Sequence, residues 1–236
     1  MGSEAGMVLM WQGAADSHDV LGEVLDACRD AGAGPAKPWS MRLRAFQPHV
    51  FNVVTENEDK EQAAKLVRSV WVVAPCQDER APATTARDST LVVLQEGHET
   101  VMQGTHTIET ILAALKAYRP VHSTTVTGKQ MVVCGCLVRV GSVEVLVRSD
   151  WEWRGVVVEI SLLGPNSKHL GGGPPGDAEA MRELAATLAG ACESDTGRLV
   201  PVPVELERFG LPDSGQPWGQ MHSAAALAAA VAGSRS

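Results

Sequence analysis

The alternation of apolar and polar positions is most regular between Lys129 and Leu163, where three short runs follow one another. Successive side chains of a strand point to opposite faces, so each run predicts one strand with one apolar face. Gly141-Ser142 is expected to end the first run, and Asp150 follows the second. The apolar faces consist of Val132, Cys134, Cys136, Val138 and Val140, then Val143, Val145 and Val147, then Val156, Val158, Ile160 and Leu162.

The opposite faces of these three strands are mixed in character. Arg139, Glu144, Arg148 and Glu159 fall there or at the strand ends. One apolar face and one mixed face are typical of an antiparallel sheet wrapped around a core. We therefore expect an antiparallel meander with an apolar, chemically inert interior.

The remaining elements follow from the same periodicities. Strands are predicted over 7–11, 39–45, 70–74 and 121–126, with a hairpin over 90–103 and a turn at Gly128. Helices are predicted over 20–28, 108–119, 181–188 and 221–232, and Pro120 ends the second of them. This order lacks the strict strand–helix alternation of doubly wound folds. The predicted fold class is α+β, a curved antiparallel sheet forming a partly open β-barrel with packed helices.

The length of 236 residues suits a single domain over 1–236 with a sizeable core. Two stretches rich in proline, glycine and polar residues interrupt the pattern, at 76–89 and 166–176. Such composition cannot bury enough apolar surface to order itself, so both are predicted to be flexible insertions. Residues 199–217 contain four prolines and are expected to be extended.

Charge and cysteine content exclude several classes of protein. The formal net charge of −8 is the wrong sign for a stand-alone nucleic-acid binder, so no direct nucleic-acid contact is expected. The longest run of small apolar residues, 224–232, is well short of the ~20 residues of a membrane span, and the first residues do not resemble a secretory signal. Five scattered cysteines, an odd number, predict free thiols in a reducing compartment.

Two groups of residues are weighed as metal ligands. Cys134 and Cys136 would share one strand face about 7 Å apart, yet no second pair or histidine completes a site, so core packing is preferred. Glu205 and Glu207 would point the same way from a strand and could hold Mg²⁺ or Mn²⁺, but a solvated strand edge is the default interpretation. No serine-nucleophile or phosphate-binding motif is present. We expect neither a cofactor nor a metal, and no enzymatic activity.

Large aromatic side chains in loops offer the strongest binding signal. Trp151 and Trp153 flank a charged turn, and Phe209 and Trp218 lie in the proline-rich tail. Aromatic residues are enriched among interface residues that carry binding energy. These four are the candidate partner-interface residues, with packing onto the chain's own core as the alternative for each.

A series of short motifs resembles the subunit 20 family of the Mediator complex. Residues 135–143 (GCLVRVGSV) and 154–160 (RGVVVEI) are similar to two of its strand signatures, although Cys136 and Leu162 replace the family's aspartate and tyrosine. Residues 11–12 (WQ), 39–48 (WSMRLRAFQP) and 209–213 (FGLPD) resemble further motifs in the family's order. Together they span nearly the whole chain.

The resemblance implies a specific function. Subunit 20 is a non-catalytic scaffold in the Mediator head module, which couples transcriptional regulators to RNA polymerase II in the nucleus. The implied partners are Mediator subunit 18, as a heterodimer, and subunit 8 with the rest of the head, with only indirect contact to RNA polymerase II. The resemblance also implies a partly open β-barrel with packed helices.

Two alternatives stay open beside the scaffold hypothesis. One is a metal-dependent phosphohydrolase of the β-tunnel type that uses Glu205 and Glu207; it requires acids and lysines alternating inward on several strands. The other is the related subunit 18 or another small-molecule-binding barrel, against which the motif at 209–213 argues.

Overall fold

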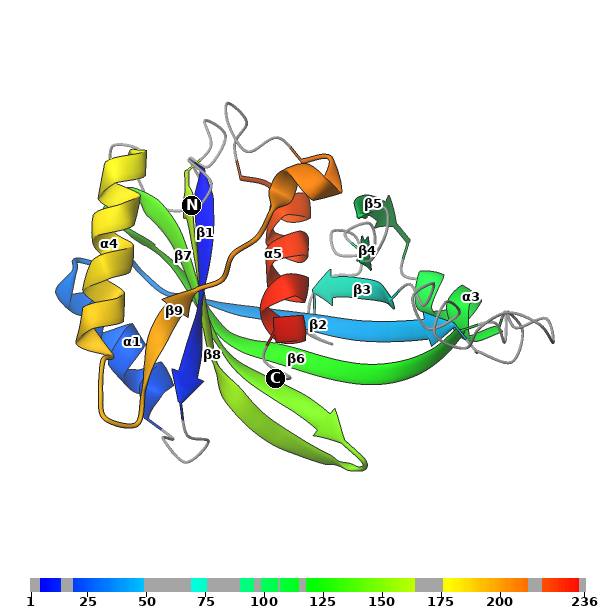
Figure 1. Cartoon of the computed structure of the whole chain (residues 1–236). Coiled ribbons are helices and arrows are strands. Elements are labelled where there is room, and N and C mark those ends of the chain that lie inside the picture. Colours follow the sequence, from blue (N-terminus) through cyan, green and yellow to red (C-terminus); the bar gives the residue numbers. More distant parts are fainter. Residues whose placement is uncertain are drawn as a thin grey trace.

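The computed structural model describes residues 5–13, 19–48, 69–75, 90–95, 99–105, 107–114, 118–163, 176–211 and 218–233. These residues form one nine-stranded antiparallel sheet in the order β5-β4-β3-β2-β6-β7-β8-β1-β9 (Figure 1). The strands β5 and β9 lie at opposite edges and do not pair, so this curved sheet is not closed. The predicted α+β class with a curved antiparallel sheet is confirmed.

Long strands form the centre of the sheet and short ones its edges. The strands are β1 (Gly6–Gly13), β2 (Lys37–Pro48), β3 (Ser69–Pro75), β4 (Thr90–Gln95), β5 (Thr100–Gly104), β6 (Tyr118–Val133), β7 (Cys136–Val147), β8 (Asp150–Leu162) and β9 (Gly197–Pro201). The helices are α1 (Val20–Asp30), α3 (Ile108–Ala114), α4 (Ala178–Ala191), α5 (Gln220–Gly233) and the 3-10 helix η2 (Leu206–Phe209). The predicted insertion 76–89 and all of 166–176 except Gly176 lie outside the described residues.

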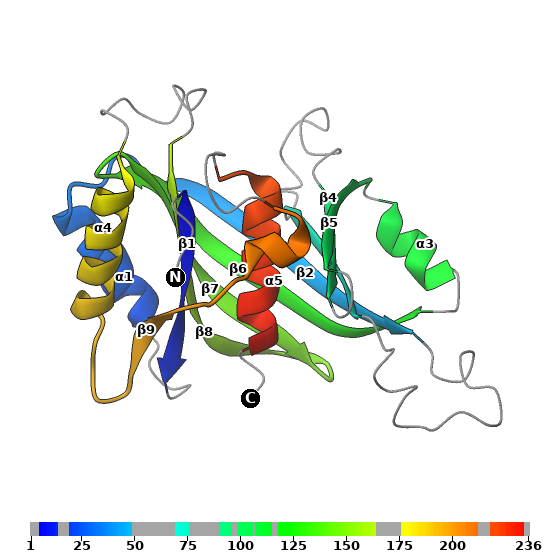
Figure 2. The same ribbon diagram turned by 45° about the horizontal axis from the view of Figure 1, so that its top comes forward.

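Helices cover both faces of the sheet (Figures 1 and 2). We call the face that contacts α5 the inner face; Leu43, Val126, Val143 and Val157 point from it into one core. On the outer face, α1 and α4 cover the end that includes β1, β7 and β8, where Val24 and Leu188 pack into a second core. At the other end of the outer face, α3 contributes Leu112 to a smaller cluster.

Burial of both faces overturns one expectation about the meander. The prediction of one apolar and one mixed face holds for part of β7, but Val156–Ser161 of β8 are buried without interruption. Val156, Val158 and Ile160 face the outer core, while Val157 and Glu159 face α5. The sequence pattern did not indicate this because the helix that covers the second face lies about 60 residues farther along the chain.

The predicted helix 108–119 ends early. α3 stops at Ala114, and Tyr118 already begins β6, where it pairs with Pro48 of β2. Pro120 lies inside that strand, next to a register shift between Ala45 and Phe46. A bulge tolerates a residue without a backbone donor, so the long pairing with β2 prevails over the local helical pattern.

The sequence predicted a turn at Gly128 and a strand end at Gly141, but both residues lie within strands. Gly128 and Gly141 pair with each other inside the continuous strands β6 and β7. A Cβ on Gly128 would lie 1.9 Å from the carbonyl oxygen of Val140, so the absence of side chains lets these strands approach closely where the sheet bends.

The turn between β6 and β7 is formed by Cys134 and Gly135, both with positive φ (48° and 74°). A two-residue turn with positive φ at both positions matches the twist of a hairpin. The prediction that Cys134 and Cys136 share a strand face is therefore wrong: Cys134 is exposed at the turn and Cys136 is buried in β7.

Candidate functional site

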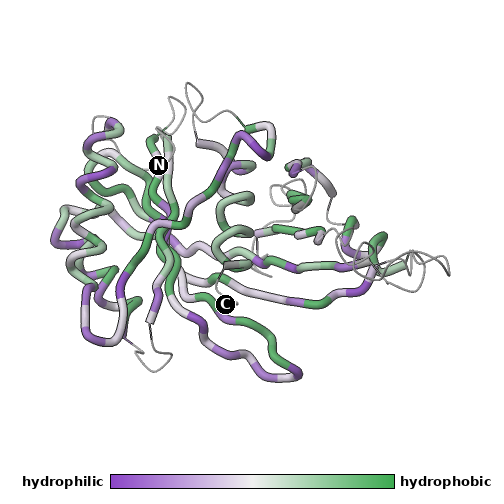
Figure 3. Tube along the Cα trace, in the orientation of Figure 1, coloured by the Kyte–Doolittle hydropathy of each residue, from purple (hydrophilic) through white to green (hydrophobic). Residues whose placement is uncertain are grey.

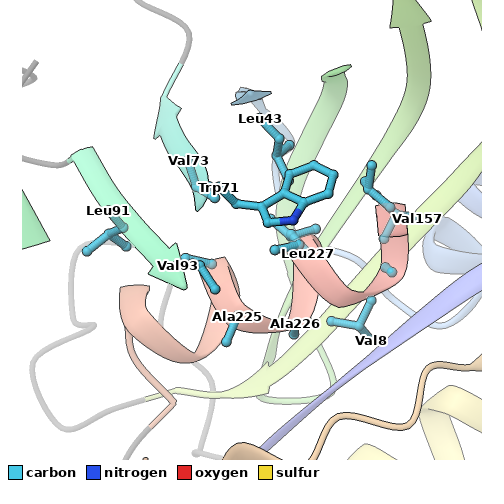
Figure 4. Packing of buried hydrophobic residues seen from close by; sticks show 14 of the residues in the cluster. Val8, Leu43, Trp71, Val73, Leu91, Val93, Val157, Ala225, Ala226 and Leu227 are labelled. Atoms are coloured by element: carbon cyan, nitrogen blue, oxygen red, sulfur yellow. The ribbon is translucent and has the colours of Figure 1, made fainter. Parts of the chain in front are cut away.

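The inner face of the sheet is filled by α5. Its sequence is nearly all alanine, leucine and valine, and Ala224 to Ala228 are fully buried. Figure 3 shows the apolar character of this helix. In Figure 4, the Trp71 ring lies against Leu227, with Leu43 and Val157 on either side. Small side chains let the helix lie close to the sheet. Apolar side chains of the helix and of the strands therefore fill the space between them.

A second layer encloses α5 from the opposite side. The chain leaves β9, crosses the helix and forms η2, as Figure 2 shows. Leu206 and Leu211 of this crossing segment are buried in the same core as α5. The left-handed conformation of Gly210 (φ 67°) caps η2 and directs Leu211 back toward that core. The helix is thus held between the sheet and the segment 201–211.

A buried carboxylate interrupts the apolar inner face. Glu159 of β8 is only 1% exposed, and its Oε1 accepts hydrogen bonds from Ser223 Oγ (2.5 Å) and Trp218 Nε1 (2.8 Å). Arg139 Nη1 of the neighbouring strand lies 3.1 Å from the same oxygen, and its guanidinium carbon lies 5.9 Å from the centroid of the Trp39 ring. A buried charge with a cationic partner and neutral donors is fully compensated.

The Glu159 cluster fastens the start of α5 to the sheet. Trp218 and Ser223 come from the entry and first turn of the helix, whereas Arg139 and Glu159 come from adjacent strands. Trp218 also lies over Gly6 of β1: a Cβ there would be 2.2 Å from the indole ring. A cavity of about 290 Å³ adjoins the cluster, lined by Trp39, Ser40, Met41, Pro75, Leu91, Arg139, Glu159, Gln220, Ser223 and Leu227.

Glu205 and Glu207 do not form the predicted strand pair. Glu205 precedes the 3-10 helix η2 and Glu207 lies within it, because the chain turns there to bring Leu206 into the core. Glu205 instead lies 3.2 Å from Arg208, which also reaches Glu99 at 2.5 Å. Within the described ranges, no group of three or more His, Cys, Asp or Glu residues is placed to hold a metal ion.

The four candidate interface residues lie in different surroundings. Trp151 is 48% exposed near the tip of the β7–β8 hairpin, whereas Trp153 packs partly against the outer core. Phe209 and Trp218 pack partly against the inner core, on the opposite side of the sheet. Trp151 and Trp153 thus lie on one strand of the β7–β8 hairpin, apart from Phe209 and Trp218. Their role in partner binding stays a prediction.

Sequence reasoning missed the apolar surface around Trp151. Leu146 of β7 pairs with Trp151 across the hairpin and is 36% exposed, and Val121 of β6 is 37% exposed. A cavity of about 420 Å³ lies between these strands. The alternation of Val143, Val145 and Val147 indicated a strand, but it directed attention to the buried face and away from Leu146.

Four cysteines fall within the described ranges, and all are free thiols. Burial, reinforced by the nearby Cys192 thiol, raises the pKa of Cys28 to about 11. Burial, together with Glu23, raises the pKa of Cys192 to about 11 as well. These two thiols are held protonated between α1 and α4, which suits packing and not nucleophilic chemistry. No helix in the described part of the chain is long and apolar enough to cross a membrane.

No protein-family model and no curated protein matches this chain. Among solved structures, a Pyrococcus horikoshii protein matches with a TM-score of 0.41 and 9% identity, covering 83% of this chain and 93% of that one. A Bacillus halodurans protein described as a candidate adenylate cyclase matches at 0.38 and 10%, covering 89% and 99%. A chain in the Schizosaccharomyces pombe Mediator head module matches at 0.34 and 9%, covering 78% and 91%. Likenesses this distant carry no argument about function.

Proposed function

We propose that this chain is a non-catalytic scaffold subunit of the Mediator head module, acting in the nucleus through protein–protein contacts. Its proposed partners are subunit 18, as a heterodimer, and subunit 8 with the rest of the head. RNA polymerase II would be reached indirectly. The motifs between residues 11 and 213 that resemble subunit 20 support this assignment.

The single observation that carries the proposal is the position of α5 on the inner face. A tunnel hydrolase needs an open, solvated interior in which acids and lysines meet a triphosphate. Here Ala224 to Ala228 fill the corresponding space, and Glu159, the buried acid on that face, is bonded to Arg139, Trp218 and Ser223. Because the interior is filled, we place the functional contacts of this chain on the outer surface of the sheet.

The outer surface offers features that suit a partner. Leu146 and Trp151 expose apolar area on a hairpin that projects from the sheet (Figure 1). Exposed aromatic and aliphatic residues surrounded by charged ones are typical of interaction sites. Arg148 and Arg154 supply such charges next to this pair.

Affinity purification of the tagged full chain from nuclear extracts of its source organism, followed by mass spectrometry, tests the proposal. Stoichiometric recovery of the subunits 18 and 8 is the expected result. The competing hydrolase hypothesis is tested by release of phosphate from nucleoside triphosphates with Mn²⁺, using the double variant Glu205→Gln, Glu207→Gln as the control. Turnover that this variant abolishes, without recovery of head subunits, would reject the scaffold proposal.

A further inference from the structure

Strands β6 and β7 separate at one end of the sheet. Their pairing stops at Thr124 and Val145, although β6 extends back to Tyr118 and β7 continues to Val147. Beyond that point Tyr118–Ser123 run beside β2, and the end of β7 pairs only with β8 among the described strands. Figures 1 and 2 both show the β7–β8 hairpin diverging from β6.

Two register shifts explain why the strands separate. Along β6, Ala45 pairs with His122 and Phe46 with Pro120, so Val121 is the extra residue. Along β8, Val143 pairs with Gly155 and Glu144 with Trp153, so Arg154 is the extra residue. A bulge bends its strand and redirects the extra side chain. The two bulges lie on either side of the point where β6 and β7 part.

Both extra residues line the same cavity. The space of about 420 Å³ is lined by Val121, His122, Val145, Leu146, Val147, Arg148 and Arg154. Val121 and Leu146 are 37% and 36% exposed, and Trp151 pairs with Leu146 across the hairpin. The apolar part of the lining thus comes from the margins of two strands, with Val121 on β6 and Val145, Leu146 and Val147 on β7.

The charge of this lining contrasts with that of the chain. The residues that line the cavity include two arginines but no carboxylate, whereas the whole chain carries a net charge of −8. Glu152 outside the lining neutralises part of this charge, since its Oε2 lies 2.6 Å from Arg154. Arg148 remains to attract a carboxylate, because opposite charges across an interface set its orientation.

We propose that this gap between β6 and β7, the β6–β7 gap, receives an extended segment of a partner subunit that carries acidic and apolar side chains. The inference rests on the proposed scaffold function and specifies its contact surface. An extended segment fits because strand margins offer backbone donors and acceptors that an added strand can use. Its apolar side chains would contact Val121 and Leu146, and a carboxylate would pair with Arg148.

The test uses the full chain in a reconstituted complex with subunits 18 and 8. A photo-crosslinking residue, benzoylphenylalanine, replaces Leu146 in one preparation and Ile111 of α3 in another; Ile111 is the matched control because it is an apolar side chain 48% exposed elsewhere. Mass spectrometry then identifies the partner peptide joined at each position. Crosslinking at Leu146 to a peptide with carboxylates, and none at Ile111, is the expected result.

Affinity measurements with variants complete the test. Leu146→Asp combined with Arg148→Glu should weaken the complex by about tenfold or more, because it removes an apolar anchor and reverses a charge. Arg198→Glu, the same charge reversal on the exposed edge strand β9, should change the affinity by less than about twofold. Hydrogen exchange should show new protection of backbone amides in Tyr118–Ser123 upon complex formation.

The outcomes separate the two proposals. A complex that forms with full affinity in the Leu146→Asp, Arg148→Glu variant, or that crosslinks at Leu146 only to a helical peptide, overturns the β6–β7 gap as a strand-binding site and leaves the scaffold function standing. Failure of the wild-type chain to form any complex with these subunits rejects both.

Discussion

Trp218 donates its indole N–H to Oε1 of Glu159 over 2.8 Å and so links the entry of α5 to the middle of β8. The two residues are separated by 59 positions in the chain. Gly6 of β1 lies beneath the same indole, which leaves no room for a side chain. This contact holds one end of the helix that fills the inner face.

Removal of the Glu159 charge should destabilise the fold. Glu159→Gln weakens the bonds from Arg139, Trp218 and Ser223, and a hydrogen bond to a charged group contributes about 1.5–3 kcal/mol. We expect the free energy of unfolding to fall by about that amount, measured by urea denaturation. The double variant Arg139→Met, Glu159→Leu should be less destabilised than Glu159→Leu alone, since no unpaired charge remains. Equal stability of the two would contradict the assigned pairing.

The close approach of α5 should make its alanines intolerant of larger side chains. Ala226 and Leu227 are fully buried against the sheet. Ala226→Leu should cost about 1–3 kcal/mol through overpacking, and Leu227→Ala about 2–5 kcal/mol through the cavity it leaves. Ala229, less buried on the same helix, supplies the control Ala229→Leu. Thermal unfolding that ranks Ala229→Leu as the most damaging of the three would show that α5 is seated differently.

The two hairpin tryptophans should respond differently to truncation. Trp151 is 48% exposed, so Trp151→Ala should lower recovery of the partner subunits and leave the melting temperature nearly unchanged. Trp153 packs partly against the outer core, so Trp153→Ala should lower the melting temperature as well. Affinity recovery and circular dichroism on the same preparations check both. Undiminished recovery with Trp151→Ala would remove that residue from the interface.

Stability should decline in alkaline solution because of the two buried free thiols, Cys28 and Cys192. Folding raises the pKa of both Cys28 and Cys192 from 9.0 to about 11. A thiol whose pKa is higher in the folded than in the unfolded state contributes its full stabilisation below pH 9. This contribution is lost as the pH rises from 9 toward 11. The free energy of unfolding should therefore fall across that window more steeply for wild type than for Cys28→Ala, Cys192→Ala. Parallel pH profiles would contradict the raised pKa values.

Thiol reactivity gives an independent check on the cysteines. At pH 8, alkylation followed by peptide mapping should modify the exposed Cys134 rapidly. Cys28 and Cys192 should react only on unfolding, because little thiolate is present and both side chains are buried. Rapid modification of Cys28 in folded protein would argue against the packing of α1 on α4.

The sequence alone determined the class of fold and most elements, because two-residue and helical periodicities depend only on local chain geometry. Helices α1 and α4 and the strand character of the meander follow from such patterns, but its turns do not, because the predicted first strand spans the Cys134–Gly135 turn. The tertiary structure decided what depends on residues far apart in the chain: that α5 occupies the inner face, that Glu159 is buried there, and that Tyr118 belongs to a strand. It also decided that Val121 and Arg154 line one cavity, since a bulge depends on how two strands align. No local pattern encodes that alignment, so the proposed binding gap emerges only when the sheet is assembled.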